Sequence, residues 1–124
     1  MRPQDFYTKS RASLGVRVEL IDPAGNKEWV RVRSIASDEF RQAAREALLR
    51  AAREGKGIGG DPAERKRQLR RRRAELAAAL IADWSLPMTA DTERADLLMI
   101  NPRLRRGIER VAENHSLHFG VRHD

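Results

Sequence analysis

Between residues 15 and 36, apolar and polar positions alternate along the chain. Residues 16–20, VRVEL, and 30–33, VRVR, each predict a strand with one buried face. Residues 22–26, DPAGN, are typical of the turn between them, because proline presets the backbone and glycine permits a positive φ. Trp29 falls on the face opposite the valines, as a cross-strand anchor or a partner contact. Because a two-stranded hairpin is marginal in water, it must add a strand, pair with another copy or lie on helices.

Helical spacing begins at Ser37, which we predict to be the N-cap of a helix that ends at Gly55. Two acidic residues follow Ser37, where they favour the positive end of the helix dipole. The apolar face of this helix comprises Phe40, Ala44, Ala47, Leu48 and Ala51. Residues 55–60, GKGIGG, then form a flexible connector.

A second helix is predicted from Asp61, a capping residue followed by proline at the first helical position. Leu76, Leu80 and Trp84 recur at four-residue spacing, so we expect this helix to continue to about Trp84. Its first half, residues 65–73, carries seven basic residues and should lie in solvent or on a partner. Its second half should be packed.

Leu86-Pro87 stops that helix, and Thr89 or Asp91 is expected to cap a third. Asn101-Pro102 then ends the third helix and starts a fourth. The apolar faces of these two helices carry Leu97, Leu98 and Ile100, and Leu104, Ile108, Val111 and Ala112.

These elements predict an α+β fold that is mainly α, with an N-terminal β-hairpin followed by about four helices in a small bundle. We divide the single domain into a flexible arm (1–14), the hairpin (15–36) and a helical part (37–124) with a glycine-rich linker at 55–60. The chain of 124 residues has 40% hydrophobic and 35% charged residues, which does not suggest disorder. No signal-like or membrane-spanning apolar run is present, so we expect a soluble cytoplasmic protein.

The net charge is +7, and the basic excess favours an acidic partner such as nucleic acid or an acidic protein surface. The alternative is a solvated helix face balanced by nearby acids. No aromatic residue interrupts the arginines, so base stacking by this segment is not expected. The candidate polyanion-binding residues are Arg65, Lys66, Arg67, Arg70, Arg71, Arg72 and Arg73.

Nothing in the sequence indicates catalysis or a cofactor. The chain has no cysteine, no nucleophile elbow, no HExxH motif and no paired carboxylates in an apolar frame. GKGIGG lacks the Lys-Ser/Thr ending of a phosphate loop. His115, His118 and His123 lack carboxylates at ligand-like offsets, so we interpret them as surface residues and predict no metal site.

Several short motifs resemble the tail assembly chaperones of long-tailed bacteriophages. The first group is LIADW at 80–84, PMT at 87–89, the doublet Leu97-Leu98, Asn101-Pro102 and Ile108. The second group is DPAG at 22–25 and SDEF at 37–40. The loop after the tryptophan is shorter here than in many members, and the arginine block matches no hallmark of the family.

The resemblance implies a non-enzymatic chaperone that coats and solubilises the tape-measure protein and helps to recruit tail-tube subunits. It further implies action in the cytoplasm of the infected host and absence from the mature virion. An apolar groove for an amphipathic helix would suit this role. The expected partner surface comprises Leu80, Trp84, Leu97, Leu98, Ile108 and Phe119. The alternatives are a small basic nucleic-acid-binding regulator and a structural head or tail component, and the hairpin edge makes self-association plausible.

Overall fold

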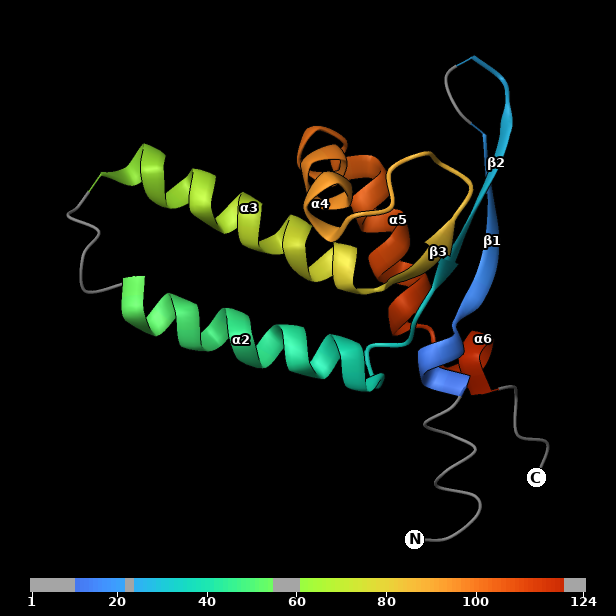
Figure 1. The fold of residues 1–124 in the computed structure, drawn as a ribbon, viewed down its shortest axis with the longest axis horizontal. Helices are drawn as coiled ribbons and strands as arrows, with labels where there is room; N and C mark the ends of the chain where they lie inside the picture. The colour runs from blue at the N-terminus through green and yellow to red at the C-terminus, as the bar shows by residue number, and fades with distance from the viewer. Residues whose placement is uncertain (1–10, 22–23, 55–60, 120–124) are drawn as a thin grey trace, which may run out of the picture.

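The computed structural model describes residues 11–21, 24–54 and 61–119, which form a three-stranded antiparallel sheet and a set of helices (Figure 1). The strands are β1 (Val16–Ile21), β2 (Lys27–Val32) and β3 (Ile81–Trp84). The helices are α2 (Asp38–Glu54), α3 (Pro62–Ala79), α4 (Asp91–Ile100), α5 (Pro102–Glu113) and α6 (His115–Phe119). The predicted α+β, mainly α fold class is confirmed.

The predicted hairpin completes itself with a third strand from later in the chain. The strand order is β1-β2-β3, so β2 is central, with Val18 opposite Val30 on one side and Trp84 opposite Val30 on the other. β3 thus pairs with the edge of β2 that the hairpin leaves open. This is the first of the three expected arrangements, in which the hairpin adds a strand.

The prediction of one helix running to about Trp84 is wrong. α3 ends at Ala79, and the next residues extend into β3. Four-residue spacing placed Leu80 and Trp84 on a helix face. Both are buried, at 2% and 4% exposure, but Leu80 is the C-cap of α3 and Trp84 pairs with Val30 of β2. The strand therefore lies inside the part of the chain that was predicted to be helical.

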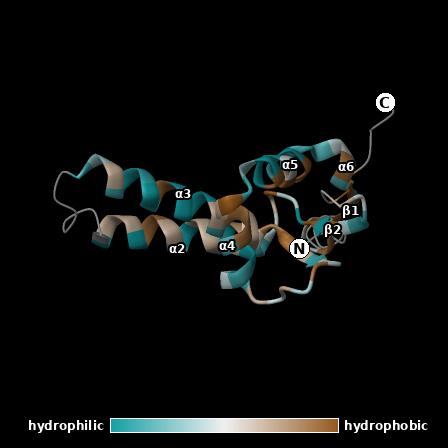
Figure 2. Cartoon of the chain, turned by 90° about the horizontal axis from the view of Figure 1, so that it is seen from above, coloured by the Kyte–Doolittle hydropathy of each residue, from teal (hydrophilic) through white to brown (hydrophobic). Residues whose placement is uncertain are grey.

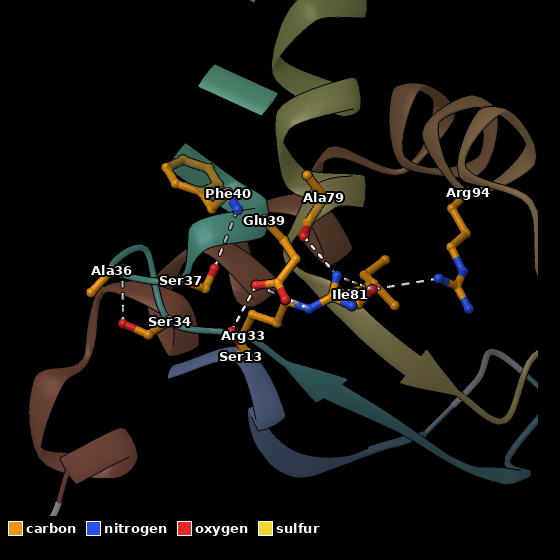
Figure 3. A network of polar contacts seen from close by, with 10 residues as sticks. All are labelled: Ser13, Arg33, Ser34, Ala36, Ser37, Glu39, Phe40, Ala79, Ile81 and Arg94. Carbon is orange, nitrogen blue, oxygen red and sulfur yellow. Dashed lines mark hydrogen bonds and ion pairs between the residues drawn. The ribbon is translucent and has the colours of Figure 1, made fainter. Parts of the chain in front are cut away.

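Two arginines stabilise the junction between α3 and β3 (Figure 3). Arg33 donates from Nη1 to the carbonyls of Ala79 and Ile81, both at 3.1 Å, and its backbone N–H donates to the carbonyl of Leu80 at 2.6 Å. Arg94, on α4, donates to the carbonyl of Ile81 at 3.4 Å. The carbonyls of Ala79 and Leu80 lie at the end of α3, where a helix leaves carbonyls without an intrahelical partner, and that of Ile81 belongs to β3.

Side-chain caps fix most helix starts as predicted. Ser37 Oγ accepts from the N–H of Phe40 at 3.3 Å, and Asp61 Oδ1 accepts from the N–H of Ala63 at 3.1 Å. The cap prediction for α4 is wrong, because Ala90 occupies the N-cap without a side-chain bond and Asp91 is already helical. α2 ends at Glu54, and the predicted linker at 55–60 lies outside the described residues.

The predicted flexible arm (1–14) is described only from residue 11 onward. Residues 11–14 are helical, Ala12 is buried, and its carbonyl accepts from the N–H of Ser34 at 3.0 Å. Gly15 then enters β1 with φ of +84°, and a Cβ there would lie 2.7 Å from the carbonyl oxygen of Val32. This end of the arm is therefore part of the folded domain, and Gly15 is required for the close approach.

The core lies where α3, α4 and α5 meet the sheet. Ala74, Ala77 and Ala78 are fully covered on α3, and small side chains allow neighbouring elements to approach closely. Ile108 and Ala112 confirm the predicted inner face of α5. Two residues predicted on buried faces are instead exposed, since no described element covers them: Leu48 at 73% and Ile100 at 81%.

The molecule is elongated, with the α2–α3 pair at one end of its long axis and β1 and β2 at the other (Figures 1 and 2). The two helices lie side by side and extend beyond the core as a helical arm. An apolar groove lies between the strands and α5.

Candidate functional site: an apolar groove beside the sheet

A groove of about 820 Å³ opens between the inner face of the sheet, the loop after β3 and helix α5. We call it the apolar groove. Its apolar lining comes from Val18, Leu20 and Ile21 on β1, Val30 and Val32 on β2, Leu86 and Met88 in the loop, Leu97 on α4, and Leu104, Ile108 and Val111 on α5. Polar residues are few in the lining: Glu28, Asn101 and Arg103.

Strand alternation supplies one wall of the apolar groove. Val18 and Leu20 are half-buried while Arg17 and Glu19 are exposed, so β1 turns its apolar face toward α5. Val30 and Val32 are fully buried behind them on β2. Val30 and Val32 are therefore the packed part of this wall, and Val18 and Leu20 are the part that stays partly exposed.

Gly107 leaves one position of the opposite wall, on α5, without a side chain. It lines the groove from the middle of α5, and a Cβ built there would meet no atom within 4 Å. Glycine inside a helix lowers stability by about 0.5–1 kcal/mol relative to alanine. The position thus leaves open space at a site where most side chains would fit.

Trp84 fixes the loop that forms the third border. Its indole Nε1 donates to the carbonyl of Met88 at 2.5 Å, and the guanidinium of Arg94 lies 5.3 Å from its ring. Leu86 and Met88 are half-buried and pack against the core from this loop. Trp84 therefore positions two groove residues without lying in the groove.

The structure separates the six residues predicted as a partner surface. Leu80, Trp84 and Leu98 are at most 4% exposed and do not line the groove, so they are core residues. Ile108 is 2% exposed and lies in the floor of the groove, beside half-buried Leu97. Of the six residues, only Leu97 and Ile108 line the groove, and binding by this surface stays a prediction.

Phe119 lies away from the groove, on α6. Its ring centroid is 4.6 Å from that of His115 and 6.1 Å from that of His118. Sequence reasoning missed Leu86 and Gly107 as groove residues. Val18 and Leu20 were recognised as an apolar face, but nothing local showed that this face stays partly uncovered.

The arginine block is partly neutralised within the fold. Arg71 pairs with Glu75 at 3.1 Å and also with Asp96 of α4, and these carboxylates raise its pKa above the ordinary value. Arg67 pairs with Glu64 at 3.2 Å. Lys66, Arg70 and Arg73 are exposed, and Arg72 is half-buried.

His118 differs from the predicted surface histidine. It is 2% exposed, its Nε2 lies 3.0 Å from the carbonyl of Val111, and its Nδ1 has no hydrogen-bond partner. His115 is exposed, and His123 lies outside the described residues. Among the described residues, no group of three His, Cys, Asp or Glu side chains could hold a metal ion.

Comparison with protein-family models, curated proteins and solved structures found no significant match. Within the described ranges, no helix has the length and apolar character needed to cross a membrane.

Proposed function

We propose that this chain is a binding protein that takes an amphipathic helix into the apolar groove, and that it acts as a tail assembly chaperone of a long-tailed bacteriophage. The observation that carries the binding role is the groove of about 820 Å³ lined mainly by aliphatic side chains and methionine. The phage role rests on the motif resemblance at residues 80–84, 87–89 and 97–102.

The lining suits a helix better than a small polar ligand. Apolar side chains surround the groove, and its polar groups are confined to Glu28, Asn101 and Arg103. An amphipathic helix can place its apolar stripe against the lining and its charged face toward solvent. Met88 adds a side chain that repacks easily around different partner sequences.

The proposed partner is the tape-measure protein, a long helical protein whose apolar stripes would aggregate when uncovered. One groove contributes modest affinity, and many copies along one long helix act together. In this proposal the chain works without a cofactor in the cytoplasm of the infected host, recruits tail-tube subunits and is absent from the mature virion.

Co-expression with the tape-measure protein encoded by the same phage tests the proposal. We expect the tape-measure protein to become soluble only when this chain is present. Unchanged solubility would contradict the chaperone role. Detection of the chain by mass spectrometry in purified virions would favour a structural component instead.

Gly107→Leu tests whether the apolar groove is the binding site. The new side chain would enter open groove space, and the loss of glycine favours the helix, so we expect normal folding but lost solubilisation. Arg106→Leu adds the same side chain at the neighbouring exposed position and should solubilise as the parent does. If the folded Gly107→Leu variant solubilises the tape-measure protein as well as the parent does, the binding site lies elsewhere.

The exposed basic residues of α3 support a second candidate, a nucleic-acid-binding regulator. Lys66, Arg70 and Arg73 have solvent-exposed side chains on one helix. Phosphate binding by them must weaken steeply as salt rises. A mobility-shift titration with duplex and single-stranded DNA tests this candidate, and no binding at low salt would eliminate it.

A further inference from the structure

Strand β1 is the longer of the two edge strands of the sheet. The order β1-β2-β3 leaves β1 with one strand neighbour in the described part of the chain, whereas β2 has two. Figure 1 shows β1 at the end of the molecule farthest from the helical arm. An edge of this kind presents backbone N–H and C=O groups that can pair with another strand.

The hydrogen bonds of β2 establish which groups of β1 point outward. The carbonyl of Trp29 accepts from the N–H of Ser85 at 3.0 Å, so the backbone of Trp29 faces the β3 side. Alternation turns Val30 the other way, toward its partner Val18 on β1. The residues on either side of Val18 therefore direct their N–H and C=O groups away from the sheet.

Those two residues carry opposite charges. Arg17 precedes Val18 and Glu19 follows it, and both side chains are exposed on the same face of the sheet. We propose that β1 pairs antiparallel with β1 of a second copy of this chain, about a two-fold axis at Val18. This register places Arg17 of each copy opposite Glu19 of the other.

The neighbouring registers are unfavourable. The nearest two-fold pairings that keep both apolar faces on one side centre on the residue before or after Val18. Centring on Arg17 sets arginine against arginine, and centring on Glu19 sets glutamate against glutamate. Like charges directly opposite each other destabilise a strand pair, so of these three registers only the one at Val18 is complementary.

Within one copy, Arg17 contacts an aromatic ring and faces a like charge, both on β2. Its guanidinium lies 4.6 Å from the ring centroid of Trp29, which holds it on the exposed face. Across β1–β2 it faces Arg31, a like-charge pair within one copy. Glu19 of the second copy would offset that repulsion.

The apolar residues match in the same register. Val16 lies opposite Leu20 of the second copy, and the two Val18 residues meet at the axis. Ile21, which is 77% exposed, and Gly15 lie opposite each other at the ends of the paired segment. Because Val18 and Leu20 also line the apolar groove, the two grooves meet along the axis of the dimer.

Sedimentation velocity of the full chain over a range of concentrations tests the dimer. We expect a species of twice the 14.1 kDa chain mass. Arg17→Glu or Glu19→Arg alone should raise the dimer dissociation constant about tenfold, because each creates two like-charge pairs. The double variant R17E/E19R restores opposite charges in both pairs and should dimerise like the parent.

Lys27→Glu is the matched control, since it reverses an exposed charge on the central strand and should leave the dimer unchanged. Circular dichroism and thermal melting establish that each variant is folded. A chain that stays monomeric at all concentrations would overturn the proposal. A dimer equally stable in both single reversals would overturn it too, by placing the contact elsewhere. The test uses this chain alone, so its result is independent of tape-measure binding.

Discussion

At the scale of single residues, the indole of Trp84 joins the core to the loop that borders the apolar groove. The ring is 4% exposed, and its Nε1 donates to the carbonyl of Met88. The aromatic ring of Trp84 fills space in the core, and its Nε1–H, by binding the carbonyl of Met88, fixes the path of the loop after β3. The two contributions can therefore be separated by substitution.

Trp84→Phe should lower the free energy of unfolding by about 1 kcal/mol, because most of the buried surface stays and one hydrogen bond is lost. Trp84→Ala should lower it by about 3–5 kcal/mol, because a large core side chain is removed. Urea denaturation measures both changes. An alanine variant of nearly normal stability that has lost partner binding would instead mark Trp84 as a direct contact.

His118 should make the stability of the fold sensitive to acid. Burial lowers the pKa of His118 in the folded protein below its ordinary value of about 6.5. The unfolded chain then binds a proton more readily than the folded one, so stability is lost as the pH falls from about 6.5 through the lowered pKa. The acceptor at Val111 accounts for a neutral ring protonated on Nε2.

We expect His118→Gln to lose less stability than the parent between pH 7.5 and pH 5, because the amide can still donate but does not titrate. Thermal melting at the two pH values measures the difference. His115→Gln, at an exposed site in the same helix, should behave like the parent. Equal pH dependence in the His118 variant would show that the buried imidazole is not responsible.

At the scale of elements, the change from α3 to β3 is the feature that local spacing could not reveal. Leu76, Leu80 and Trp84 fit a helix, whereas Ile81 and Trp84 are three residues apart and do not follow the alternation of a regular strand. They share a face because the register between β2 and β3 shifts, so that they pair with Val32 and Val30. The choice depends on the free edge of β2 and on donors from Arg33, which lies 48 residues from Ile81 in sequence. Local patterns did predict the hairpin, the cap at Asp61 and the inner face of α5, because those depend on neighbouring residues.

Arg33→Met should destabilise the junction by about 1–3 kcal/mol, because the carbonyls of Ala79 and Ile81 lose a charged donor. The methionine keeps most of the aliphatic stem, so the loss reports the hydrogen bonds. Urea denaturation measures it, and Arg45→Met, at an exposed site on α2, is the control. A loss no larger than that of the control would contradict the assigned role of Arg33.

The apolar groove was only half predictable from sequence. Alternation identified Val18 and Leu20 as an inward face, and helical spacing identified Ile108 on α5. How far apart these faces lie depends on the tilt of α5 and on the loop held by Trp84, which are properties of the assembled chain. The same reason explains why Leu98 was assigned to a surface although α4 turns it into the core.

At the scale of the whole molecule, burial decreases along the long axis from the sheet toward the tip of the helical arm. On α3, residues 62–70 are exposed or half-buried, whereas Ala74, Ala77 and Ala78 are covered. Local opening is easiest where few side chains are buried. The arm should therefore open without unfolding of the sheet.

We expect backbone amides at 66–70 to exchange with deuterium much faster than those at 76–79 of the same helix. Mass spectrometry of the exchanged protein after proteolysis measures both segments. The C-terminal half of α5 serves as a reference, because Ile108 and Ala112 are buried there. Equal protection at the two ends of α3 would show that the arm is held by contacts outside this fold.

The late position of β3 in the sequence also affects how the chain is synthesised. Residue 81 is made 48 residues after residue 33, and at 5–20 residues per second this interval is about 2–10 s. During that time β2 has an open edge, which β3 covers in the finished sheet. Pairing between hairpins on neighbouring ribosomes thus competes with completion of the sheet, and a slower ribosome prolongs that competition.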